Sequence, residues 1–197
     1  MDKQMLKTSF SLLFKYLICI TMSVIVTVSL FMIFAAISES GDDVTGVRYA
    51  VMLVLSAFCS LSTLVLFING KVFYIGDSDA NKVQFGRIEF DKFKGLKLGV
   101  VPAVFALISY IVLILGKLGI VGAWASVLFN FTNYHLFAYH QLIFGGNNNI
   151  ADMSWPSIAA ASLTIFLVPL ICHVCYTLGY KRINLFEKVV FKKKGDK

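Results

Sequence analysis

The sequence predicts an all-α, polytopic integral membrane helix bundle, with four transmembrane helices and one interfacial or re-entrant helix. Of its 197 residues, 58% are apolar and only 15% are charged, and the mean hydropathy is +0.78. A soluble domain carries about a quarter charged residues, and a disordered chain has far fewer apolar side chains. Long apolar stretches alternate with connections that differ sharply in charge. These observations exclude a free soluble domain and leave a single membrane domain.

Four apolar stretches reach the roughly 20 residues that cross the hydrocarbon core of a bilayer. The second of them has a tail that continues through Tyr74. The four stretches are Tyr16 to Ile37, Tyr49 to Ile68, Leu98 to Leu115 and Pro156 to Tyr180. The first is expected to remain as a helix and not to be cleaved, because its uncharged run is longer than the 7–15 residues of a signal-peptide core. Asp152 or Ser154 is expected to cap the last one.

The basic residues predict the orientation of these helices. Of the 18 Lys and Arg residues, 16 lie at the N-terminal end, between the second and third stretches, or after the last stretch, and the exceptions are Arg48 and Lys117. The connections 38–47 and 141–155 contain acidic residues, and Arg48 stands just outside the first of them. Short cytoplasmic loops are rich in Lys and Arg. Both termini are therefore predicted to be cytoplasmic, in a cell membrane that we expect to be a bacterial inner membrane.

A fifth apolar stretch, Leu118 to Tyr139, differs from the others because it carries amide and imidazole side chains, which are costly in hydrocarbon. The charge pattern places both of its ends outside. We therefore predict an interfacial or re-entrant helix on the outer side, where Trp124 suits the headgroup level. The alternative is a fifth crossing, reached through the turn at 116–119, with the basic tail outside.

Polar residues near this stretch form the first candidate site. Asn130, Asn133, His140 and Gln141 would share one face of a continuous helix. Such a face in a membrane must meet protein, water or headgroups. It could line the path of a small solute, together with His173, which follows Pro169 in the last helix. The alternative is an interfacial helix whose polar side faces water, with His173 a hydrogen-bonded packing residue.

Cys172 and Cys175 form the second candidate, a possible redox pair one helical turn apart. Lys181 follows closely, which places the pair near the cytoplasmic end, and there is no second such motif to complete a metal site. A packed, reduced pair is the favoured interpretation. Small polar residues on the first two helices, by contrast, predict a packing seam between them. They are Ser23, Thr27, Ser56, Ser60 and Thr63.

The remaining charges predict contact with lipid. Basic residues after the last helix suit anionic lipids of the inner leaflet, and positive-inside topology explains the charge without a nucleic-acid partner. These are Lys181, Arg182, Lys188, Lys192, Lys193 and Lys194. The stretch that begins at Asp77 resembles a calcium loop, but Lys82 and Ile88 stand where glycine and glutamate are required.

These observations predict a non-enzymatic integral membrane protein, an accessory or scaffold subunit that acts through another membrane protein. No catalytic residue, cofactor or metal is predicted, since the sequence has no phosphate loop and no hydrolase or metalloprotease motif. The first alternative is a small-solute transport subunit that uses the polar residues of the fifth stretch. The second is a membrane thiol oxidoreductase that uses Cys172 and Cys175.

Overall fold

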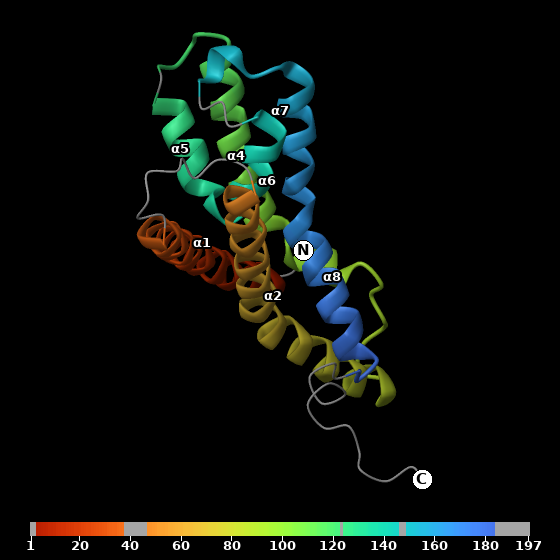
Figure 1. Ribbon diagram of the computed structural model, residues 1–197. Coiled ribbons are helices and arrows are strands. Elements are labelled where there is room, and N and C mark those ends of the chain that lie inside the picture. The colour runs from red at the N-terminus through yellow and green to blue at the C-terminus, as the bar shows by residue number, and fades with distance from the viewer. Residues whose placement is uncertain (1–2, 38–46, 123, 146–148, 184–197) are drawn as a thin grey trace.

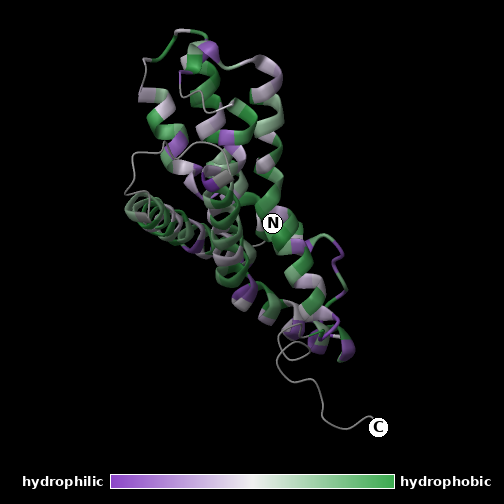
Figure 2. Ribbon diagram, viewed as in Figure 1, coloured by the Kyte–Doolittle hydropathy of each residue, from purple (hydrophilic) through white to green (hydrophobic). Residues whose placement is uncertain are grey.

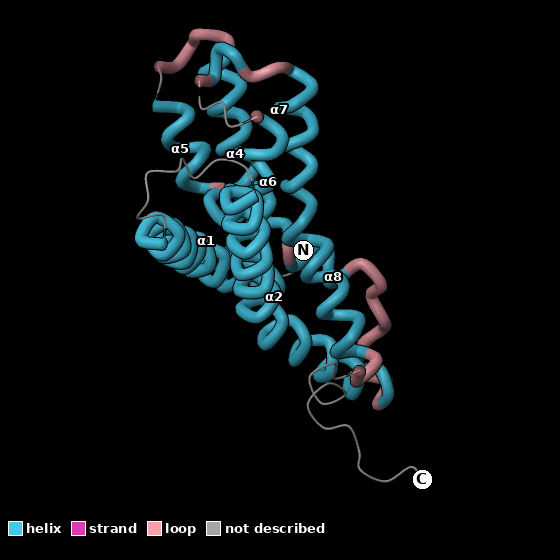
Figure 3. Tube along the Cα trace, in the orientation of Figure 1, coloured by secondary structure: helices cyan, strands magenta, loops and turns pink. Residues whose placement is uncertain are grey.

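A computed structural model of the chain describes residues 3–37, 47–122, 124–145 and 149–183. Within these residues all regular structure is helical and no strand occurs, which confirms the all-α fold class (Figure 3). The elements in chain order are α1 (Lys3–Ile37), α2 (Val47–Gln84), α3 (Lys94–Leu98), α4 (Val100–Lys117), α5 (Trp124–Thr132), η1 (Tyr134–Leu136), α6 (Phe137–Phe144), η2 (Ile150–Asp152), α7 (Trp155–Ser162), η3 (Leu163–Phe166) and α8 (Leu167–Tyr180).

Four helices in the described part of the chain are long and apolar enough to cross a membrane, judged by length and composition. They are α1, α2, α4 and the continuous run α7–η3–α8. Their ribbons are mostly apolar, whereas polar residues gather where α2 and α8 end together (Figure 2). These helices contain three of the four predicted stretches in full and the third stretch from Val100 onward, since Leu98 ends α3. They indicate a membrane-embedded protein.

The first two helices extend beyond the predicted stretches. α1 has 35 residues and α2 has 38, so at 1.5 Å per residue they are about 52 and 57 Å long. The hydrocarbon core is only about 30 Å thick. The end of α2 continues beside α8 (Figure 1), where Arg182 forms an ion pair with Asp77. Contact with α8 therefore explains why α2 continues as a helix beyond Asp77, where the sequence indicated the start of a loop.

The fifth apolar stretch doubles back on itself. A Cβ atom built on Gly116, at the end of α4, would lie 2.8 Å from the side chain of Ala125 and 3.1 Å from that of Ile150. The start of α5 and the start of η2 therefore lie at the same end of α4. Between them, Asn133 bonds Ser109 in the middle of α4. We call α5, η1 and α6 the hairpin; Figure 1 shows it entering and leaving at one end of the bundle.

The core has two main parts. One lies between α1, α2 and α8 and contains Tyr16, Leu64 and Cys172. The other joins α4, the hairpin and α7, around Tyr110 and Phe129. The predicted polar seam between α1 and α2 is present at the hydrogen bond between Thr27 and Ser56, whose hydroxyl oxygens are 2.7 Å apart. At the start of α7, Ser154 accepts a hydrogen bond from the backbone N–H of Ser157, which confirms the predicted cap.

Candidate functional site

The hairpin turns at Asn133, which is buried. Its side-chain amide donates to the backbone carbonyl of Phe129 at 3.0 Å, and its nitrogen lies 3.2 Å from the hydroxyl oxygen of Thr132. The same nitrogen lies 2.7 Å from the hydroxyl oxygen of Ser109, which in turn donates to the carbonyl of Ala106. Asn133 directly follows the last residue of α5, and its side chain connects the tip of the hairpin to α4 by a hydrogen bond. Within a membrane, backbone that is not helical requires such protein partners.

His135 lies at the tip of the hairpin and contacts α1. Its Nε2 is 3.4 Å from the hydroxyl oxygen of Tyr16, and the two rings meet edge to face with centroids 5.0 Å apart. Its Nδ1 has no hydrogen-bond partner among the described residues. A cavity of about 30 Å³ lies beside the ring and is also lined by Ser56 of α2. That volume has room for one or two water molecules, not for a larger solute.

His140, on α6, bonds the hydroxyl group of Tyr110 at 3.1 Å. The Tyr110 oxygen also lies 2.7 Å from the hydroxyl oxygen of Thr164 and 2.7 Å from the carbonyl oxygen of Ala161. One set of donors satisfies this group: Nε2–H of His140 donates to Tyr110, and Tyr110 donates to Ala161 or Thr164. The imidazole also packs against Phe129, with ring centroids 5.0 Å apart. The three polar groups therefore join α4, α6 and the α7–η3 segment.

The predicted polar face does not exist as one surface. Asn130 and Asn133 precede the turn, whereas His140 and Gln141 follow it, so the four residues do not lie on one continuous helix. Asn130 is half-buried. His173 lies elsewhere, on α8 beside Gly95 of α3, and its Nδ1 is buried without a partner among the described residues. Asn133 and His140 therefore lie together in the buried part of the hairpin, whereas His173 lies apart from them on α8.

Cys172 and Cys175 are both buried, as free cysteines, in the core between α1, α2 and α8. No other cysteine, histidine, aspartate or glutamate joins them in a group that could hold a metal within the described residues. The arrangement is that of packed apolar side chains. A thiol substrate would have to open this core to reach either sulfur atom.

Two of the predicted lipid contacts lie in the described residues. Lys181 follows the end of α8, and Arg182 pairs with Asp77 of α2 at 3.1 Å and also bonds Asn81. Arg182 therefore joins the ends of α2 and α8. The other predicted contacts lie outside the described residues. They are Lys188, Lys192, Lys193 and Lys194.

Several residues of the hairpin core were not predicted from the sequence. Tyr16 and Tyr110 are the hydrogen-bond partners of the two histidines, and Thr164 bonds the hydroxyl group of Tyr110. The sequence feature that could have identified them is a hydroxyl group inside an apolar stretch, because such a group must form a hydrogen bond within the protein. In comparisons with known proteins, no family model, no curated protein and no solved structure matches this chain.

The hydroxyl group of Tyr110 is expected to stabilise the fold. The Tyr110→Phe variant leaves His140 without its partner, so the free energy of unfolding should fall by about 1–2 kcal/mol. Thermal unfolding in detergent measures this loss. Tyr139→Phe is the matched control, because Tyr139 is exposed and makes only a 3.3 Å bond to a backbone carbonyl. Equal unfolding temperatures for the two variants would contradict a bonding role for Tyr110.

Proposed function

We propose that this chain is a non-enzymatic integral membrane protein, an accessory or scaffold subunit that binds a transmembrane helix of a partner membrane protein. The observation that carries the proposal is an apolar groove of about 600 Å³ on the surface of the bundle, between α2 and the hairpin. The polar groups nearby support the same function. Asn133 and His140 bond other parts of the fold, so their bonds contribute to holding the hairpin in place.

The groove has the shape and chemistry that suit a helix. Its α2 side is formed by residues spaced three and four apart on one helical face: Ala50, Leu53, Val54, Ala57 and Leu61. Its hairpin side includes Ala138, Leu142 and Gly145. Small side chains on both sides allow close approach of a neighbouring helix in a membrane, where packing drives association. The side chains of Val54 and Leu142 are 68% and 74% exposed, so they are available to a partner.

A small-solute transport subunit is the second candidate. The observation that favours it is the cavity beside His135, where a buried ring nitrogen has no partner among the described residues. The cavity volume of about 30 Å³ would require the hairpin to move before a solute could enter. A thiol oxidoreductase is less favoured, since Cys172 and Cys175 are buried.

Photo-cross-linking in cells tests the proposed partner contact. A photoreactive amino acid at Val54 and, separately, at Leu142 should each capture the same membrane protein. Phe58, which is 70% exposed on α2 but does not line the groove, is the control position and should yield lipid adducts. Ala50→Trp, which fills the groove from an exposed position, should abolish both protein products while leaving the chain folded. Lipid adducts alone at all three positions would contradict the proposal.

The orientation is part of the proposal. The end of the bundle where α2, α3 and α8 meet carries Lys82, Lys94 and Lys97, and we place it in the cytoplasm, with both termini. The hairpin then opens toward the outside of a bacterial inner membrane. The charge distribution supports this orientation through the preference of basic residues for the cytoplasmic side.

A further inference from the structure

Polar residues line one face of α1 and a facing stretch of α2 near the basic end of the bundle. On α1 they are spaced four, seven and eleven residues from the first, and on α2 seven and eleven, which keeps each set on one side of its helix. We call this set of facing residues the α1–α2 cleft, and its part at Gln4, Thr8, Ser78 and Lys82 lines a cavity. Its α1 residues are Gln4, Thr8, Ser11 and Lys15, and its α2 residues are Lys71, Ser78 and Lys82.

Two lysines at the inner end of the cleft cross between the helices. Lys15 of α1 donates to the backbone carbonyl of Phe67 on α2 at 3.1 Å, and Lys71 of α2 donates to the hydroxyl group of Ser11 on α1. Within the described residues, neither ammonium group has an acidic partner at ion-pair distance. Two adjacent cations inside helices that could span a membrane are costly unless an anion accompanies them.

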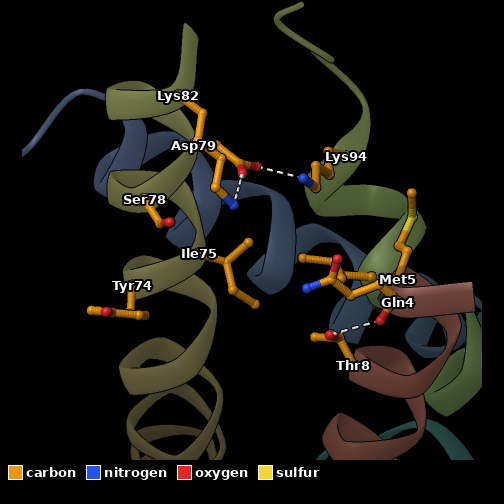
Figure 4. A pocket seen from close by; sticks show the side chains of 10 residues that line it. Gln4, Met5, Thr8, Tyr74, Ile75, Ser78, Asp79, Lys82 and Lys94 are labelled. Carbon is orange, nitrogen blue, oxygen red and sulfur yellow. Dashed lines mark hydrogen bonds and ion pairs between the residues drawn. The ribbon is translucent and has the colours of Figure 1, made fainter. Parts of the chain in front are cut away.

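The outer end of the cleft opens into a cavity of about 230 Å³ that α3 closes on its third side (Figure 4). Lys82 of α2 and Lys94 of α3 lie on its wall, with Gln4 and Thr8 across from them on α1. A water molecule accounts for about 30 Å³ of liquid volume, so the cavity has room for a small polar group. Its donors are the ammonium groups, the side-chain amide of Gln4 and the hydroxyl group of Ser78, which are typical partners of an anion. The hydroxyl group of Thr8 already donates to the backbone carbonyl of Gln4.

Asp79 forms ion pairs with the two lysines on the cavity wall, but its single negative charge does not balance all the lysines of the cleft. Its carboxylate is buried and contacts Lys94 at 2.6 Å and Lys82 at 3.8 Å, and it accepts a hydrogen bond from Tyr176 at 3.0 Å. Two lysines therefore border a cavity whose wall carries one carboxylate, and Lys15 and Lys71 add two more positive charges further along the facing helices. The carboxylate oxygens already have partners, so the remaining positive charge is available to a ligand.

We propose that the α1–α2 cleft binds a phosphate group, and that in the membrane this group belongs to the headgroup of an anionic lipid. Lysine binds phosphate as a point charge, and hydroxyl and amide donors can complete its hydrogen bonds. The exposed apolar side chains of Ile18 and Met22 follow Lys15 on the same face of α1, where acyl chains would continue from a headgroup bound at the cleft. The proposal does not depend on the groove between α2 and α6.

Lipid binding to the purified full-length chain tests this site. In detergent, native mass spectrometry measures the affinity for short-chain phosphatidylglycerol and for phosphatidylcholine. The double variant Lys71→Gln, Lys82→Gln should weaken phosphatidylglycerol binding at least about tenfold. The matched control is Lys92→Gln, Lys117→Gln, which removes the same charge outside the cleft and should change the affinity less than about twofold. Equal losses in the two double variants would overturn the proposal.

Two further arms identify the source of the phosphate and guard against misfolding. Competition by inorganic phosphate or glycerol 3-phosphate, lost in the same double variant, would support the phosphate site but assign it to a soluble ligand. Ser78→Asp keeps every lysine and adds a negative charge to the cavity wall, so it should also weaken phosphatidylglycerol binding at an unchanged unfolding temperature. Unchanged binding in a folded Ser78→Asp variant would overturn the proposal.

Discussion

Gly179→Ala is expected to lower the free energy of unfolding by about 3 kcal/mol, because the backbones of α8 and α2 touch at this position. A Cβ atom on Gly179 would overlap the carbonyl group of Phe73. One turn along the same contact, a Cβ atom on Gly76 would overlap the carbonyl oxygen of Tyr176 and lie 2.8 Å from the backbone nitrogen of Tyr180. Backbone atoms of two packed helices cannot rotate away as a flexible side chain can. The helices must separate, and the core they share loses its contacts.

Gly70→Ala is the matched control on α2, since a Cβ atom there would meet no atom within 4 Å. Alanine is favoured over glycine inside a helix by about 0.5–1 kcal/mol, so this variant should be slightly more stable than the parent. Thermal unfolding in detergent, followed with a thiol-reactive dye, compares the two variants, because Cys19 and Cys172 are fully buried in the folded chain. A Gly179→Ala variant that unfolds at the same temperature as Gly70→Ala would contradict the close contact.

The sequence predicted the features that depend on local composition. Uncharged apolar runs located the four long helices, because hydrocarbon excludes charge over a fixed thickness. The N-cap at Ser154 and the seam between Thr27 and Ser56 followed from residue type and spacing. The charge pattern also indicated that the fifth stretch starts and ends on the same side. In the structure, the start of α5 and the start of η2 lie at the same end of α4, since Ala125 and Ile150 both approach Gly116; their side of the membrane stays a prediction.

The turn inside the hairpin could not be predicted from periodicity. The stretch reads as one helix, but α5 stops at Thr132 because Asn133 and the residues after it are held by distant partners. Asn133 bonds Ser109, His135 bonds Tyr16 and His140 bonds Tyr110. These partners lie on helices that only the folded chain brings together, so a tertiary contact decides a local break. The proposed polar face failed for the same reason, since its residues lie on both sides of the break.

The glycines of α3 carried a signal that spacing could have revealed. Gly95 and Gly99 are four residues apart, and Cβ atoms there would meet the Cα atoms of His173 and Pro169 at 2.6 and 2.5 Å. Small residues at this spacing allow close contact between helices. α3 is too short to cross a membrane, so a search for spans misses it. Its contact with α8 nevertheless positions Lys94, whose ammonium group pairs with Asp79 at the α1–α2 cleft.

Cysteine labelling should place Gly122 and Ala151 on the same side of the membrane and Lys92 on the opposite side. Single cysteines are introduced at these positions after Cys19, Cys59, Cys172 and Cys175 are changed to alanine. With an impermeant thiol reagent on intact cells, positions 122 and 151 should react fully, whereas position 92 should react only after lysis. The reason is that α4 separates Lys92 from Gly122, while the hairpin returns the chain to the side where it entered.

Each alternative topology gives a different labelling pattern. Five crossings would keep Gly122 outside but place Ala151 inside, so position 151 would react only after lysis and the hairpin would have to span the bilayer. That result would contradict the contact of both Ala125 and Ile150 with Gly116, and it would favour a solute path through the hairpin. A reversed protein would expose Lys92 and protect both other positions. In that case the hairpin stands, but the α1–α2 cleft faces outward and its phosphate must come from the outer leaflet.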